Sequence, residues 1–227
     1  MRGKTELTLQ SKTLRWAGYF AIAAAALYVG TTATGSLLDP SYSQIRQHVS
    51  DLTATGASTD AELAPPFILY NLLVFAFAMN LYTAFRHIRL FRIGLGLLTA
   101  NAIAGVMMVT WFTEDLGGTP TTPAGIGHVV FASVSSIAIV LGSFVYGFAF
   151  RRTVRPWRAM SVLSFGVGIL FILAAPFAVM ATAANSDLAG LAERAAIAPF
   201  IVWLLGAGGF LLFRAHESLR LRRRVQA

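Results

Sequence analysis

Residues 126–150 read IGHVVFASVSSIAIVLGSFVYGFAF, a run of 25 residues without Asp, Glu, Lys or Arg. A helix needs about 20 apolar residues to cross a hydrocarbon core about 30 Å thick. Five further runs satisfy this requirement, at 14–34, 66–85, 93–112, 160–181 and 195–213. The sequence therefore predicts an all-α polytopic membrane protein in which residues 1–227 form a single domain of six transmembrane helices.

The composition agrees with residence in a membrane, because 56% of the residues are hydrophobic and 12% are charged. Soluble domains carry roughly twice this share of charged residues. The chain contains no cysteine. This absence excludes disulfides, thiolate metal sites and a cysteine nucleophile.

The net charge of +8 is unevenly distributed. All lysines and arginines except Arg46 and Arg194 lie in the two termini and in the second and fourth connections, whereas only Glu6 and Glu217 among the acids lie there. Short basic loops stay in the cytoplasm. We therefore expect a multi-pass protein of the cell membrane with cytoplasmic N- and C-termini. The even number of runs independently requires both termini to lie on the same side of the membrane.

We interpret the basic excess as a topology signal with some attraction to anionic lipids. The expected partners are membrane lipids and not nucleic acid, and a homo-oligomer or another membrane subunit remains an open alternative. The basic N-terminus followed by an apolar run also fits a signal peptide, but the run is longer than a signal h-region. The only lysines, Lys4 and Lys12, lie outside the runs, which excludes a retinal Schiff base. No Asp, Glu, Lys or Arg lies near the middle of a run, so a proton relay or an energy-coupled transporter lacks the residues it needs.

The first connection contains the segment DPSYSQIRQHVSDL at 39–52. Its Asp-Pro pair suits the start of a helix, and Ile45, Val49 and Leu52 share one face at helical spacing. The opposite face is polar and carries Gln44, Gln47, His48 and Asp51. We predict a short amphipathic helix in the first extracytoplasmic loop. It is either an interfacial helix on the bilayer or a lid whose polar face covers something polar between the membrane helices.

Three connections on the predicted outer side carry titratable groups. The candidate catalytic residues are His48, Asp51, Asp115, His128 and Glu193, and the candidate substrate-binding residues are Arg46, Ser50 and Arg194. His128 has apolar neighbours and needs a polar partner, for which Asp115 or Glu114 is nearest along the chain. Imidazole and carboxylate are ligands that suit zinc, so His48, Asp115, His128 and Glu193 form a candidate site for a divalent metal such as zinc.

The same groups can perform general acid–base chemistry if burial brings their pKa values toward neutrality. The sequence contains neither HExxH nor Gly-x-Ser-x-Gly. A hydrogen-bonded plug that fastens the first connection onto the bundle would use the same residues. Both interpretations remain open.

Four features in this order resemble an uncharacterised family of six-helix prokaryotic membrane proteins, catalogued as a domain of unknown function (DUF 998). They are the segment Tyr42–Leu52, the acids after Thr113, His128 and the segment Gly190–Arg194. The resemblance covers essentially the whole chain. The resemblance implies the fold, residence in the plasma membrane and an outer set of polar residues that belong together. It implies no established activity. The family pattern has Phe-Pro before the acid, and its absence here leaves open whether Glu114 or Asp115 is the matching residue.

Three functions compete. The first is a lipid-directed hydrolase or transferase, with metal assistance as one form of it, that acts on a head group at the outer leaflet. The second is a protein that binds or transports a lipid or small amphiphile in a cleft between the outer helix halves. The third is a structural accessory subunit. The sequence leaves the question of enzyme or non-enzyme undecided.

Overall fold

The computed structural model describes the backbone of residues 2–153 and 157–226 and the side chains of residues 11–153 and 157–217. These residues form six long α-helices, one short 3-10 helix and no strand. The α-helices are α1 (Arg2–Leu38), α2 (Asp60–Ala84), α3 (Arg89–Thr110), α4 (Pro123–Arg151), α5 (Arg158–Ala183) and α6 (Ala189–Gln226), and the 3-10 helix is η1 (Ser50–Thr53). Each predicted apolar run falls on one α-helix, and α1 and α6 extend well beyond their runs toward the termini, which confirms the predicted helical class.

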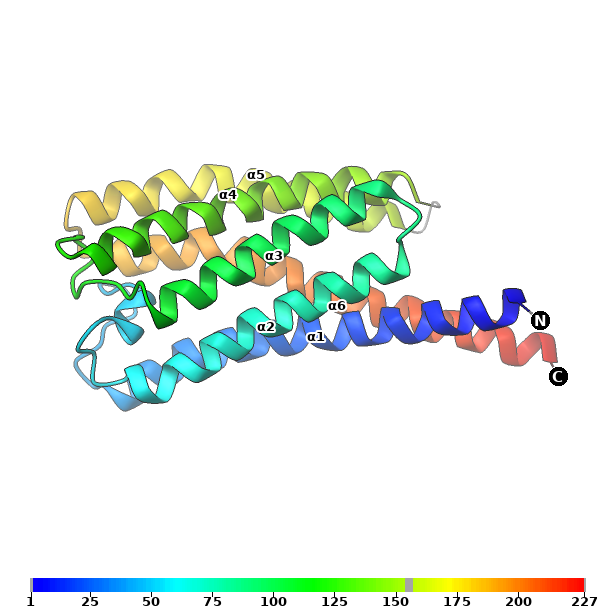
Figure 1. Cartoon of the computed structure of the whole chain (residues 1–227), viewed down its shortest axis with the longest axis horizontal. Helices are drawn as coiled ribbons and strands as arrows, with labels where there is room; N and C mark the ends of the chain where they lie inside the picture. The colour runs from blue at the N-terminus through cyan, green and yellow to red at the C-terminus, as the bar shows by residue number, and fades with distance from the viewer. Residues whose placement is uncertain (1, 154–156, 227) are drawn as a thin grey trace.

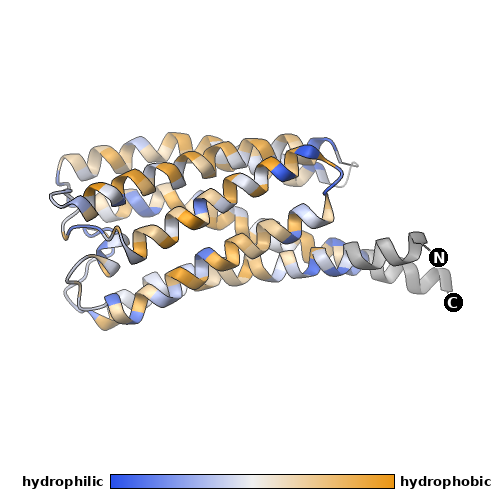
Figure 2. Cartoon of the chain, viewed as in Figure 1, coloured by the Kyte–Doolittle hydropathy of each residue, from blue (hydrophilic) through white to orange (hydrophobic). Residues whose placement is uncertain are grey.

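All six helices are long and apolar enough to cross a membrane. Even the shortest, α3, has 22 residues and extends about 33 Å at 1.5 Å per residue. Large apolar side chains remain exposed on the outside of the bundle, such as Val162, Leu173 and Phe177 of α5, which are 72%, 59% and 67% exposed. Figure 2 shows hydrophobic residues along the helices and hydrophilic residues concentrated at the connections. The protein is a multi-pass membrane protein.

The helices form a closed ring, because each packs mainly against its neighbours in the chain and α1 packs against α6. The connections α1–α2, α3–α4 and α5–α6 meet at one end of the bundle, which we call the loop end (Figure 1). Both termini lie at the opposite end, the terminal end, where α1 and α6 extend beyond the other helices (Figure 1). Three separate connections are thereby brought together at the loop end, as the topology predicts.

The predicted membrane orientation rests on basic residues, and the structure describes the side chains of only some of them. The side chains of Arg2, Lys4, Arg155, Arg220, Arg222, Arg223 and Arg224 lie outside the described residues.

Aromatic side chains fill the half of the ring nearer the terminal end. Phe85 and Phe91 stack with their ring centroids 4.5 Å apart, and Trp157 packs edge-on against Phe85 at 4.9 Å. Tyr146 covers Gly94, where a Cβ atom would lie 2.6 Å from the tyrosine Cζ. This close packing joins α2, α3, α4 and α5 at one end of the ring and leaves the loop end as the place for a cavity.

The predicted amphipathic helix over 39–52 does not form. After α1 ends at Leu38 the chain follows turns, and only Ser50–Thr53 are helical. Ile45 is 52% exposed, whereas Val49 and Leu52 are buried, so the three do not share a face. The physical reason is competition for backbone groups, because carbonyls that a helix would use internally accept hydrogen bonds from elsewhere in the fold.

Candidate functional site

The first connection, residues 39–59, which we call loop 1, is fastened to α6 by Arg194. The Arg194 guanidinium donates from Nε to Gln44 Oε1 at 3.0 Å and from Nη1 to the Gln47 carbonyl at 2.9 Å. It also donates from Nη2 to the Tyr42 hydroxyl and lies over the Tyr42 ring, with Cζ 5.7 Å from the centroid. The Tyr42 hydroxyl in turn donates to the His48 carbonyl at 2.7 Å. Arg194 therefore binds loop 1 and is not free to bind a substrate.

The first turn of α6 also uses loop 1 as its cap. The backbone N–H groups of Gly190 and Leu191 donate to the carbonyls of Arg46 and Ile45, at 3.3 and 2.9 Å. These are N–H groups that a helix start leaves without an internal partner. A Cβ atom at Gly190 would lie 2.0 Å from the Gln47 carbonyl oxygen. Glycine is therefore required at this position for loop 1 to approach the helix.

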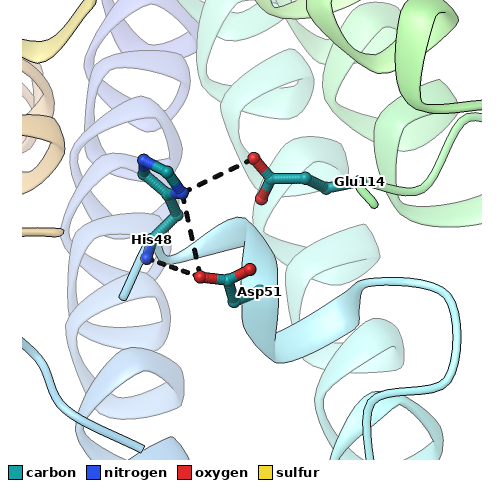
Figure 3. Close-up of side chains that lie close together, drawn as sticks. All are labelled: His48, Asp51 and Glu114. Atoms are coloured by element: carbon teal, nitrogen blue, oxygen red, sulfur yellow. Dashed lines mark hydrogen bonds and ion pairs between the residues drawn. The ribbon is translucent and has the colours of Figure 1, made fainter. Parts of the chain in front are cut away.

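Beneath loop 1, three titratable side chains point toward one another, as Figure 3 shows. The His48 Nδ1 atom lies 3.7 Å from Asp51 Oδ2 and 3.6 Å from Glu114 Oε1. The side chains of His48 and Asp51 are 9% and 4% exposed, and that of Glu114 is 12% exposed. We call these three residues the His48 cluster. It joins loop 1 to the α3–α4 connection.

Asp51 holds the cluster in place through both carboxylate oxygens. Oδ2 accepts from the His48 backbone N–H at 2.8 Å, and Oδ1 accepts from the Gly117 N–H at 3.1 Å. One backbone hydrogen bond lies alongside, where the Thr55 N–H donates to the Glu114 carbonyl at 3.0 Å. Loop 1 and the α3–α4 connection are thus joined by backbone as well as side-chain hydrogen bonds.

The burial of Glu114 among other acids changes its chemistry. Burial and the nearby acids Glu193 and Asp51, against an opposing hydrogen bond from Ser50, together raise the pKa of the Glu114 carboxyl to about 8. A carboxyl with a pKa near neutrality exchanges protons at physiological pH. The raised pKa of Glu114 makes the His48 cluster a candidate functional site.

A cavity of about 280 Å³ lies within the ring next to this cluster. Its roof is formed by Val49, Ser50 and Thr53 of loop 1, and its walls come from α2, α3, α4, α5 and α6 with Tyr28 of α1. Apolar groups dominate the walls, among them Phe67, Phe171 and Phe200. Loop 1 thus covers a cavity, but the segment is not the predicted amphipathic helix and the cavity beneath it is mostly apolar.

Asp115, predicted as a catalytic and metal-binding residue, does not belong to the His48 cluster. Its carboxylate accepts hydrogen bonds from the backbone N–H groups and hydroxyls of Thr121 and Thr122. These bonds lower its pKa to about 2, and Thr122 in turn caps α4 by accepting from the Gly125 N–H at 3.0 Å. Asp115 therefore stabilises the start of α4, and the neighbouring acid Glu114 is the one that reaches His48.

The remaining predicted residues lie in different places. His128 is 9% exposed, lines the cavity and has Nδ1 2.9 Å from the Phe112 carbonyl. Glu193 also lines the cavity and accepts a hydrogen bond from the Val49 N–H. Ser50 lines the cavity, and the Arg46 side chain is exposed. The structure thus brings His48 and Asp51 together in the cluster, places His128, Glu193 and Ser50 on the cavity wall, and leaves Arg46 outside.

Three contributors were not singled out from the sequence as site residues, and a fourth, Glu114, was named only as an alternative to Asp115. Thr182 binds His48 Nε2 at 2.9 Å, and Glu114 completes the cluster. Tyr28 and Asn101 line the cavity, and within the described residues the Tyr28 hydroxyl and the Asn101 Nδ2 atom are buried without a hydrogen-bond partner. An asparagine within a membrane helix is a sequence signal that could have pointed to Asn101, although hydrogen bonds between helices explain most such asparagines.

The comparisons with known proteins agree with the topology. Residues 22–209, which is most of the chain, match the family described as "Protein of unknown function (DUF998)". No curated protein and no solved structure matches the chain. The match confirms the resemblance found in the sequence, and the chain belongs to the DUF998 family of multi-pass membrane proteins of unknown function.

Proposed function

We propose that this protein binds a lipid or small amphiphile in the cavity at the loop end, and that this end faces the extracytoplasmic side of the cell membrane. The orientation rests on the basic residues of the termini and of the α2–α3 and α4–α5 connections, since such loops stay in the cytoplasm. The ligand then approaches from the outer leaflet, which agrees with the apolar walls of the cavity.

The observation that carries the proposal is the chemistry of the cavity wall. Binding sites for small molecules are concave and mostly apolar, with a few convergent polar groups that orient the ligand. Here the apolar walls surround the Tyr28 hydroxyl and the Asn101 amide, whose buried donors have no partner among the described residues. A buried polar group without a partner costs about 1–3 kcal/mol. A ligand with a hydrogen-bonding head and an apolar body would remove this cost.

Access from the membrane is a further part of the proposal. Val179 of α5 lines the cavity and is 69% exposed, so the cavity has an exposed residue on its α5 side. A molecule dissolved in the bilayer would enter there without crossing water, which favours an amphiphile over a soluble metabolite.

Binding is tested by identifying what co-purifies with the full-length protein. Ser136 lines the cavity, while Ser133, one turn away on α4, is exposed to lipid. The Ser136→Phe variant fills the cavity, and Ser133→Phe is the matched control with the same change in size. We expect lipid extraction and native mass spectrometry to find a bound amphiphile in wild type and in Ser133→Phe, and to find it lost in Ser136→Phe. Equal amounts in all three proteins, or no bound amphiphile in wild type, would refute the proposal.

Hydrolysis or group transfer on a lipid is the second candidate function. It is favoured by one observation, that Glu193 and His128 line the same cavity and offer a carboxylate and an imidazole to whatever binds there. Such a pair can act as general acid and base. Incubation of the protein with outer-leaflet phospholipids and lipid extraction afterwards tests it, because turnover would be lost in Glu193→Gln. Recovery of intact lipid after incubation with the wild-type protein would leave binding as the function.

A further inference from the structure

We infer that the His48 cluster is a divalent-cation site of the zinc type, in which His48 Nδ1, Asp51 Oδ2 and Glu114 Oε1 are the ligands. This ligand set differs from the one expected from the sequence, which combined His48 with Asp115, His128 and Glu193. It is independent of the amphiphile proposed for the cavity.

The first step of the argument is the tautomer of His48. Its Nε2 atom lies 2.9 Å from Thr182 Oγ1, and the Thr182 hydroxyl donates its one hydrogen to the Ala178 carbonyl at 3.0 Å. When the Thr182 hydrogen lies in this bond, Thr182 accepts from His48 and the Nε2 atom of His48 carries the proton. In the neutral imidazole the other nitrogen, Nδ1, then presents a lone pair.

The second step is what that lone pair faces. His48 Nδ1 is buried and has no hydrogen-bond partner among the described residues. The atoms in front of it are two carboxylate oxygens, at 3.6 and 3.7 Å, beyond the usual range of a hydrogen bond. Three electron-pair donors thus converge on one point. Such an arrangement is repulsive by itself and attractive around a cation.

The third step is geometry. The three donor atoms all lie within 4.8 Å of one another. Ligands of a tetrahedral zinc are about 3.3 Å apart, because each lies about 2.0–2.1 Å from the metal. Small side-chain rotations would bring the three donor atoms from their present separations, which reach up to 4.8 Å, to about 3.3 Å. Three protein ligands leave the fourth position open to water, as in zinc sites that bind or activate a small molecule.

The surroundings of the cluster have the features of an outer ligand shell. A histidine that ligates a metal usually donates its other N–H to a fixed oxygen, as His48 does to Thr182. Asp51 is fixed by the Gly117 N–H at 3.1 Å. Glu193 is a third acid near the cluster, and the neighbouring Arg194 is occupied by Gln44, Gln47 and Tyr42. A divalent cation would balance this concentration of negative charge.

A bound cation would act as a clasp on the cavity roof. Two ligands belong to loop 1 and the third to the α3–α4 connection, so the metal would cross-link two segments far apart in the sequence (Figure 3). The roof residues Val49 and Ser50 lie between the ligands His48 and Asp51 in the chain. Occupancy of the site would thereby stabilise the closed roof.

The test is metal binding by the full chain in detergent. The protein is stripped with a chelator, titrated with Zn²⁺ by calorimetry and checked by elemental analysis, with thermal stability recorded on the same samples. We expect one zinc per chain and a higher Tm with zinc. We expect His48→Gln and Glu114→Gln each to lower zinc affinity at least about tenfold, whereas His128→Gln, which alters a second buried histidine, keeps wild-type affinity.

Two results would overturn the inference. One is substoichiometric zinc in wild type together with a Tm that the chelator does not change. The other is zinc bound equally well by Glu114→Gln, which would identify an adventitious surface site. The Glu114→Gln variant keeps the size of the side chain, so it decides the question even where His48→Gln fails to fold. Cobalt substitution adds a spectroscopic check, because tetrahedral coordination gives intense visible absorption that the Glu114→Gln variant would lack.

Discussion

Gly118 lies directly against the imidazole of His48, so closely that a Cβ atom at Gly118 would be 2.4 Å from His48 Cε1 and 2.7 Å from Nδ1. The glycine belongs to the α3–α4 connection and the histidine to loop 1. The ring is thus held between Gly118 on one side and Thr182 on the other. This contact sets the position of the donor atom on which the metal site depends.

Gly118→Ala should therefore displace His48, and Gly117→Ala provides a matched control. Both glycines have positive φ, +76° at Gly118 and +88° at Gly117, so both variants bear a backbone cost of about 1–2 kcal/mol. A Cβ atom at Gly117 meets nothing within 4 Å. We expect thermal unfolding to show a similar loss of stability for both variants. Zinc titration should show weaker binding for Gly118→Ala alone. Equal zinc affinity in the two variants would contradict the role of the contact.

Arg194→Lys should detach loop 1 from α6. A lysine cannot supply the planar fork that serves Gln44, Gln47 and Tyr42 together, and the partners left without a donor are partly buried. We expect a loss of about 2–4 kcal/mol in the free energy of unfolding and faster proteolysis within loop 1. Arg46→Lys, at the exposed arginine of the same loop, should change stability by less than about 0.5 kcal/mol. Comparable losses in both variants would show that charge, and not the fork, fastens the loop.

The stability of the metal-free protein should fall as pH rises. Glu114 has a pKa of about 8 in the folded protein and a reference value of 4.5. Between these values the folded state keeps a proton that the unfolded state has lost, so the free energy of unfolding decreases with increasing pH. The full stability is present below about pH 4.5 and the loss is complete above about pH 8, with a magnitude of a few kcal/mol.

Thermal unfolding in the presence of a chelator measures this dependence. Glu114→Gln removes the titrating group, so its profile should be flatter over the same range. A wild-type Tm that rises from pH 5 to pH 8 in the chelated protein would contradict the raised pKa.

Asp115→Asn should weaken the start of α4 without changing the cluster. Asp115 accepts four hydrogen bonds from Thr121 and Thr122 with its two carboxylate oxygens, and an asparagine amide has only one oxygen to accept them. We expect a lower Tm and unchanged zinc affinity. Because hydrogen bonds lower the pKa of Asp115 to about 2, its stabilising effect should be present above its reference value of 3.8 and disappear as pH falls toward 2. Loss of zinc in this variant but not in Glu114→Gln would restore Asp115 to the site.

The choice between the two adjacent acids illustrates a limit of sequence reasoning. Glu114 and Asp115 are consecutive, equally acidic and at the end of the same apolar run. Which one turns inward depends on the backbone of the α3–α4 connection, where Gly117 and Gly118 adopt positive φ. Those conformations are set by contacts with loop 1, some 60 residues earlier in the chain. The local sequence pattern could identify Glu114 and Asp115 as candidates but could not tell which of them reaches His48.

The sequence suggested a cleft between the outer helix halves but could not identify the polar groups that line it. Asn101 and Tyr28 belong to different helices, and their unpaired atoms become meaningful only because α1 and α3 meet the same space inside the ring. His128 was recognisable as a polar residue in apolar surroundings, and the structure places it on the cavity wall. Its partner is the Phe112 carbonyl and not a carboxylate, a contact that no side-chain pattern encodes.

By itself the sequence determined the six membrane helices, because insertion into hydrocarbon depends on the composition of about 20 consecutive residues. It also brought the α1–α2, α3–α4 and α5–α6 connections to one end, since the helices must alternate in direction. Only the tertiary structure decided the form of loop 1. The carbonyls of Ile45, Arg46 and Gln47 bind α6 and Arg194 instead of closing an amphipathic helix, because buried backbone groups take whichever partners the whole fold supplies.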